Sequence, residues 1–265
     1  MQIKIRHTTE YSYDQPVDYG LQKVRLHPLN SAVQDVSDWQ MQVEGGKIEA
    51  SYQDHYGNHT DLVSITPGAE KLTLTASGIV HTRDTAGVFG HIYGRAPLWH
   101  FLQSTHMTTA DAHIQELAKV VGAAETTLAG LHALSAAVLN ACPYHVGNTQ
   151  AETTAAEALK IGTGVCQDHA HIFMAAARHI GMPARYVSGY LMVNGQINQE
   201  ASHAWAEAHI AELGWVGFDI SNGVAPDEKY VRIAVGRDAR DAAPVSGMRM
   251  GNSDEDLIVY LQVQQ

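Results

Sequence analysis

The chain has 265 residues, 45% hydrophobic and 17% charged, a composition typical of a folded globular protein and not of a disordered or fibrous one. Its 17 Lys and Arg against 28 Asp and Glu give a net charge of −11, so we expect no nucleic acid partner. Residues 1–7 alternate polar and apolar side chains, unlike a signal peptide, and no run approaches the about 18 apolar residues of a membrane span. With only two cysteines, we expect a reducing, cytoplasmic setting and no membrane association.

The first third of the chain consists of short runs of alternating apolar and polar residues. Gly45-Gly46 and Pro67-Gly68 are typical of the turns between such runs. We therefore predict an all-β, sandwich-like domain over residues 1–95. Its strands are expected at 3–13, 24–26, 39–43, 47–52, 62–65 and 71–75.

Helical signals begin after residue 97. Thr108 and Thr109 are candidate caps for a first helix, and Thr154 with Glu157 has the spacing of a capping box. A helix that begins near Cys166 carries a mostly apolar stripe at positions 170, 173, 174 and 177, which indicates a packed central helix. The four helices are predicted at 110–121, 126–142, 154–162 and 166–181.

Strand patterns return in the last third of the chain. Residues 184–193 lead into Asn194-Gly195, a strong signal for a two-residue hairpin turn, and further strands are expected at 201–211, 215–219 and 256–262. Helices followed by these strands predict a second domain, residues 96–265, in which helices pack on a mostly antiparallel sheet. The fold class is therefore α+β.

Cys166 is the first candidate for chemistry. It follows Gly162-Thr-Gly-Val, where two glycines permit a tight turn into the helix. At a helix N-terminus, free backbone N–H groups and the positive end of the helix dipole stabilise a thiolate. The alternative is a small core residue, because a free cysteine is often buried and inert. Cys142, beside Pro143 at the end of an apolar helix, is predicted to be of that structural kind.

His203 and Asp219 lie on neighbouring predicted strands and complete a candidate cysteine–histidine–aspartate triad. Such a triad needs a base near the sulfur and an acceptor that orients the imidazole. Positions 203 and 219 have the same parity, so an odd loop such as 211–213 would keep both side chains on one face of the sheet. Taken singly, a strand histidine is usually structural, and an aspartate at a strand end usually forms a turn.

Four ordered segments resemble the transglutaminase-like superfamily, and the resemblance is closest to bacterial members described as cysteine proteases. The segments are residues 164–171 (GVCQDHAH), 181–190 (GMPARYVSGY), 202–205 (SHAW) and 214–219 (GWVGFD), and residues 6–13 with 24–28 are similar to the β domain that often precedes this core. The resemblance implies that Cys166 is the nucleophile, His203 the general base and acid, and Asp219 the residue that orients it.

The sequence departs from the family pattern at two places near this triad. Ile220-Ser-Asn222 stands where the family usually has a proline after the aspartate, and His169 stands where an aromatic residue is common. Neither departure touches the triad, and both are expected to alter the local turn or pocket.

The resemblance implies an enzyme that attacks an amide bond of a peptide or protein and passes through a thioester. With water as the acceptor it would be a peptidase or amidase, the outcome we favour, and with an amine it would be a transamidase. A non-catalytic peptide-binding module on the same fold is a third alternative. The Cys166 N–H and a second donor would hold the oxyanion. Tyr144 is a candidate for that donor, and a packed aromatic side chain is the alternative interpretation.

The 16 histidines raise the alternative of a metallohydrolase. His169 and His171 are two residues apart and do not share a helix face, and the sequence contains no His-Glu-x-x-His or Cys-x-x-Cys motif. It contains no EF-hand type loop either. We therefore infer no metal and no cofactor. The oligomeric state does not follow from the sequence.

Overall fold

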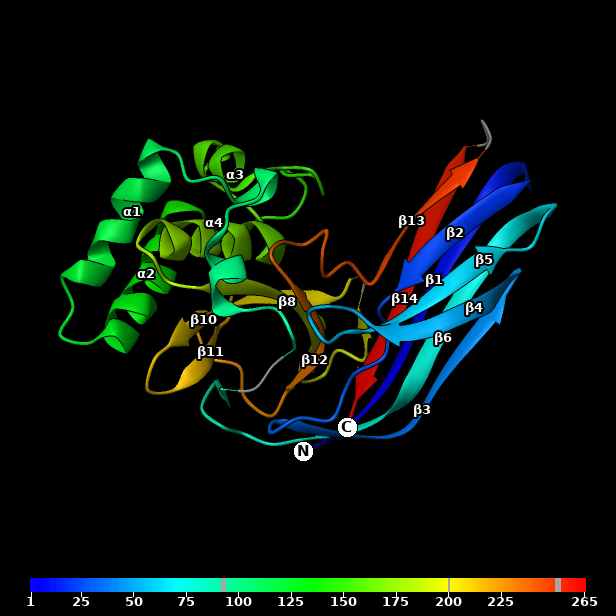
Figure 1. Ribbon diagram of the computed structural model, residues 1–265, viewed down its shortest axis with the longest axis horizontal. Coiled ribbons are helices and arrows are strands. Elements are labelled where there is room, and N and C mark those ends of the chain that lie inside the picture. The colour runs from blue at the N-terminus through cyan, green and yellow to red at the C-terminus, as the bar shows by residue number, and fades with distance from the viewer. Residues whose placement is uncertain (92–93, 200, 251–253) are drawn as a thin grey trace.

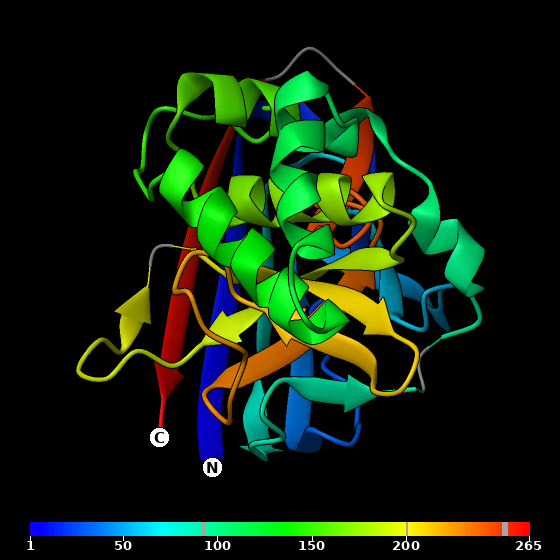
Figure 2. The ribbon, with the colours of Figure 1, turned by 90° about the vertical axis from the view of Figure 1, so that its left-hand side faces the viewer.

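The computed structural model describes residues 1–91, 94–199, 201–250 and 254–265. The helices lie on one side, a sheet of the core lies in the middle, and a β module lies on the other side (Figure 1). Turned by 90°, the helices stand in front of the sheet, and the two chain ends lie close together (Figure 2). This is the mixed α+β fold that the sequence predicts.

The β module consists of two antiparallel sheets that enclose an apolar core. Tyr11, Val24, Val63, Leu72 and Leu74 are among the buried residues of that core. The first sheet has the order β3 (Gln34–Glu44), β6 (Ala69–Thr82), β1 (Gln2–Val17), β14 (Glu255–Gln264) and β9 (Asn198–Gln199). The second has the order β13 (Val245–Met250), β2 (Tyr19–Val24), β5 (His59–Ile65) and β4 (Gly46–Gln53).

The other half of the molecule is a helical layer on an antiparallel sheet. Helix α4 is buried from Asp168 to Arg178 and contacts the sheet and all three other α-helices. The helical segments are η1 (Leu98–Leu102), η2 (His106–Thr108), α1 (Ala112–Gly122), α2 (Thr127–Ala141), α3 (Ala155–Ile161) and α4 (Cys166–His179). The sheet has the order β12 (Tyr230–Gly236), β8 (Ala184–Leu191), β10 (His203–Ile210), β11 (Gly214–Phe218) and β7 (Val88–Gly90).

Local capping signals set most helix ends as predicted. Thr154 and Glu157 form the expected capping box, and Thr126 caps α2 by accepting a hydrogen bond from the Ala129 N–H. The predicted cap of the first helix is wrong. The Asp111 side chain accepts from the Ile114 N–H, because residues 106–108 form a separate 3₁₀ turn.

Strand pairing crosses the predicted domain boundary at 95/96 in both directions along the chain. The last strands, β13 and β14, pair with β2 and β1 of the β module, β14 over ten residue pairs, while β7 precedes the boundary yet pairs with β11 of the core. Strand β12 was not predicted at all, because it is buried along its whole length and so lacks the polar–apolar alternation of a half-exposed strand. Pairing between distant segments leaves no local signal in a sequence.

Apolar contacts join the β module to the core. Strands β1, β6 and β14 contribute to the same buried cluster as α4 and β8. Their contributing side chains are Ile3, Ile5, Val80, Leu261 and Val263. The two halves therefore share one continuous core at this end.

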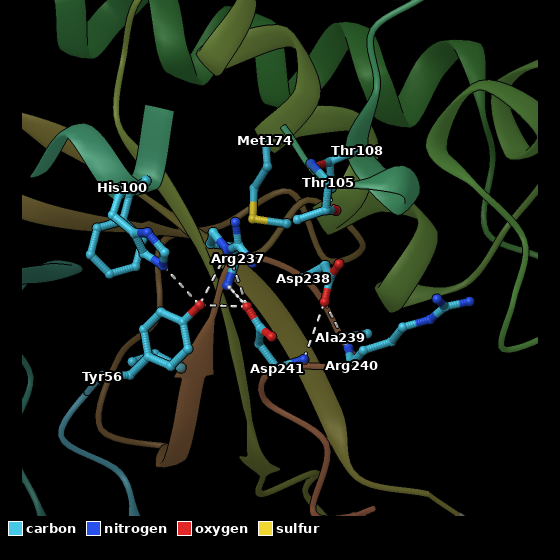
Figure 3. Close-up of polar contacts among 12 residues, drawn as sticks. Tyr56, His100, Thr105, Thr108, Met174, Arg237, Asp238, Ala239, Arg240 and Asp241 are labelled. Carbon is cyan, nitrogen blue, oxygen red and sulfur yellow. Dashed lines mark hydrogen bonds and ion pairs between the residues drawn. The ribbon is translucent and has the colours of Figure 1, made fainter. Parts of the chain in front are cut away.

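A polar cluster joins them elsewhere (Figure 3). Tyr56, between β4 and β5, donates from its hydroxyl to Asp241 Oδ2 at 2.5 Å and accepts from Arg237 Nε at 3.3 Å. The same hydroxyl lies 3.1 Å from His100 Nε2 of η1. The β module is therefore held against the loop that follows β12. Among the described residues, no helix combines the length and apolar character needed to cross a bilayer.

Candidate active site

Cys166 is the first residue of α4 and is partly exposed. Gly162 ends α3 in the left-handed region at φ +80°, and a Cβ at Gly164 would lie 2.8 Å from the Asp168 Cβ. Both glycines are thus required by the turn. Asp168 Oδ2 in turn accepts from the Val165 N–H at 2.8 Å, which fixes the start of the helix.

His203 and Asp219 lie side by side at one end of the core sheet. Ile210 pairs with Gly214, so the loop between β10 and β11 has three residues and the predicted parity is confirmed. His203 Nε2 donates to Asp219 Oδ2 at 2.7 Å. The two residues predicted to act as base and orienting acid are therefore in direct contact.

Asp219 is fully buried, and its charge is held by several donors. Tyr230 Oη and Asn222 Nδ2 each donate to Oδ2 at 2.7 Å, and the Asn222 N–H donates to Oδ1 at 3.3 Å. Burial would raise the pKa of this carboxyl, but the hydrogen bonds and the charge of His203 lower it overall. Sequence reasoning missed both supporting residues. Tyr230 lies on the unpredicted strand, and Asn222 was visible only as a departure from the family pattern.

His203 interacts with Cys166 as well as with Asp219. Because Nε2 is bonded to the carboxylate, Nδ1 is the ring nitrogen left for the thiol. Burial lowers the pKa of His203, but the hydrogen bonds to Asp219 and Cys166, with the charges of both, raise it to about 10. The contacts with Asp219 and Cys166 therefore favour the protonated form of this ring.

Tyr144 lies at the entrance to the same turn. It forms a parallel bridge with Gly164, two residues before Cys166, and 53% of its surface is exposed. It is therefore not the packed aromatic residue that was the alternative interpretation. Its hydroxyl makes no hydrogen bond within the described residues. Burial, and then the negative charges at Cys166 and Asp219, raise the pKa of Tyr144.

The two departures from the family pattern contact one another. His169 Nε2 lies 2.7 Å from the Cys142 carbonyl and must donate to it, so Nδ1 accepts from the Ser221 hydroxyl at 2.8 Å. This bridge ties the helix of Cys166 to the loop that follows Asp219.

His169 and His171 each form a hydrogen bond with the backbone of another segment of the protein. His171 Nε2 accepts from the Ala239 N–H at 3.1 Å on a different side of α4. Within the part of the chain that the structure describes, no three His, Cys, Asp or Glu side chains gather as a metal site.

Residues 115–220 match the transglutaminase-like superfamily, and residues 3–81 match the bacterial transglutaminase-like N-terminal region. Both matches are to transglutaminase-like proteins, so the core and the β module of this chain are each similar to parts of that superfamily. A solved structure from Cytophaga hutchinsonii, named a "putative cysteine protease", is 25% identical with a TM-score of 0.77 and is covered over 91% of its length, with 100% of this chain.

Curated relatives extend the similarity over the whole chain. An uncharacterized protein of Mycobacterium leprae (strain TN) is 28% identical over 274 residues, 98% of each chain. An uncharacterized protein of Mycobacterium tuberculosis (strain ATCC 25618 / H37Rv) is 28% identical over 284 residues, 96% of this chain and 90% of the relative. The β module and the core thus recur together in these relatives.

Proposed function

We propose that this chain is a cysteine-nucleophile acyl-transfer enzyme that cleaves amide bonds of peptides or proteins. The observation that carries the proposal is the His203 imidazole, held by a buried carboxylate and interacting with a thiol at a helix N-terminus. The name of the Cytophaga hutchinsonii structure supports the same class of reaction.

In the proposed acylation, the Cys166 thiolate attacks the amide carbonyl carbon and a C–S bond forms. The C–N bond then breaks as Nδ1 of protonated His203 gives its proton to the leaving amine. A thioester and a neutral imidazole remain. Asp219, through Nε2, keeps the ring in the orientation that both steps require.

The tetrahedral intermediate carries an oxyanion that needs two donors. The Cys166 N–H is one candidate, since the first N–H groups of a helix have no intrahelical acceptor and this one has none among the described residues. The exposed Tyr144 hydroxyl is the second candidate. A tyrosine so placed would lower the barrier by donating to the developing charge.

In the proposed deacylation, the neutral imidazole takes a proton from water, which attacks the thioester carbonyl and expels the thiolate. The enzyme is then a peptidase or amidase. If an amine attacks instead, the same site performs transamidation, so the acceptor decides between the two activities.

The test is a random peptide library with mass readout, run with and without an added primary amine. We expect cleaved products without the amine, and a mass increase equal to the amine minus the leaving group if transamidation competes. Cys166→Ser and His203→Gln should abolish turnover, whereas the matched control Cys142→Ser should not, because the buried Cys142 thiol only faces the Ala158 carbonyl. Turnover that survives Cys166→Ser would refute the mechanism. A folded wild type without turnover or thiol reactivity would support the non-catalytic alternative.

A further inference from the structure

A cavity of about 190 Å³ lies where the β module meets the core. His7 of β1, Leu257 and Val259 of β14, and Val245 of β13 form part of its wall. Ser202, the neighbour of His203, lines it from the core side.

The cavity is suited to an uncharged apolar side chain. His7 is 2% exposed, and its ring nitrogens are occupied by the Tyr190 hydroxyl at 2.8 Å and the Thr9 hydroxyl at 3.1 Å. Burial lowers the pKa of His7 to about 4, so the ring is neutral at physiological pH. An engineered cavity of about 150 Å³ binds benzene, so this volume has room for a phenyl ring or a branched aliphatic side chain.

Next to the cavity, the outer edge of β14 is open. Strand β9 pairs with β14 only at Leu261 and Gln262, and no strand among the described residues pairs with this edge from Glu255 to Tyr260. The edge nevertheless carries large apolar side chains, Leu257 being 54% and Ile258 45% exposed. An open edge offers backbone donors and acceptors to another extended chain.

The two faces of this edge differ in character. Leu257 and Val259 line the apolar cavity, whereas Tyr260 lines a separate hollow with Arg6 and Thr8, which Val259 also borders. A strand added to the edge would place alternate side chains on these two faces. Backbone pairing combined with pockets for alternate side chains is the usual arrangement of peptide recognition by strand addition.

Charge selects the kind of peptide. Asp14, Asp254 and Asp256 gather where β14 begins, linked by the Asp254 N–H, which donates to Asp14 Oδ1 at 2.7 Å. Within the described ranges none of the three has an ion pair, whereas Glu255 is paired with Arg249. A second copy of a chain with net charge −11 would be repelled here, and a basic side chain attracted, at the end of the edge that lies away from Arg6.

We propose that the edge of β14 docks an extended peptide in which apolar and basic residues alternate, with one apolar side chain in the cavity beside Ser202. This inference rests on the proposed function, because it treats the peptide as the substrate of the neighbouring triad. The apolar side chain in the cavity fixes the register of the docked strand.

The test uses the full chain with Cys166→Ala, which cannot turn over, and the fluorescent peptide acetyl-Gly-Phe-Lys-Phe-Lys-Gly-amide. Fluorescence anisotropy should show saturable binding that weakens about tenfold or more when both Phe are replaced by Ala, as expected for loss of a buried aromatic side chain. Adding Leu257→Asn should weaken binding similarly, and Asp256→Asn should weaken it about threefold. The matched variant Ile258→Asn, similarly exposed but pointing away from the cavity, should weaken binding less than Leu257→Asn does.

No binding of the peptide, or equal effects of Leu257→Asn and Ile258→Asn, would overturn the inference. A dimer in sedimentation that Leu257→Asn dissolves would assign the edge to a second copy and also overturn it. Because binding is measured without turnover, docking can hold even if the proposed chemistry fails. Conversely, if the wild type cleaves library peptides and Leu257→Asn cleaves them equally well, the proposed chemistry stands and only the docking is refuted.

Discussion

Replacing Asp219 by Asn isolates what the buried carboxylate does for His203. A pKa of about 10 against 6.5 for a free imidazole corresponds to at most about 5 kcal/mol in favour of the protonated ring, at about 1.36 kcal/mol per pH unit. The substituted amide would keep the size of the side chain but remove its charge, so the pKa of the ring should fall toward that of a free imidazole, with Cys166 as the remaining partner that raises it. At pH 7.5 the ring should be neutral, and turnover should fall by about 10³–10⁴.

The same substitution changes how stability depends on pH. In the wild type, the stabilisation from protonated His203 is complete below pH 6.5 and is lost as the pH rises through about 10, so the free energy of unfolding should fall over this window. In Asp219→Asn that decline should disappear. Urea unfolding at pH 6.5, 8 and 9.5 measures it, and imidazole NMR with a His203→Gln reference follows the ring itself. A ring pKa that stays above about 8 in Asp219→Asn would refute the reasoning.

Three further outcomes follow from the contacts of single side chains. Iodoacetamide at pH 7.5 should label Cys166 well before Cys142, because Cys142 is fully buried and burial, with the charge of Asp168, raises its pKa to about 11. Peptide mass mapping measures the labelling of each cysteine. Equal labelling of the two would count against an activated Cys166. Tyr230→Phe removes a 2.7 Å hydrogen bond to the triad carboxylate and should lower kcat about tenfold with little change in KM, while an unchanged kcat would show that the other donors suffice. Tyr56→Phe, at the junction of the two halves, should lower the free energy of unfolding by about 1–3 kcal/mol in urea titrations without changing kcat, and an unaltered midpoint would mean that the junction does not depend on this hydroxyl.

Local patterns were sufficient to predict much of the site. The glycines before Cys166 are followed by a helix that starts at the cysteine, and the capping box of Thr154 and Glu157 is present as predicted. The shared parity of positions 203 and 219 also predicted which residues would meet. Each of these features depends on residues close together in the chain or on the alternation of a strand, both of which a sequence displays directly.

The tertiary structure decided what surrounds those residues. Tyr230 reaches Asp219 from a strand buried on both faces, and Ser221 meets His169 across 52 positions of sequence. Strand β14 crosses back to pair with β1, and Leu257 and Val259 of this strand line a cavity together with Ser202. Such contacts arise from the pairing and packing of distant segments. The free energy of such a contact depends on how segments far apart in the chain are brought together, so no short stretch of sequence predicts it.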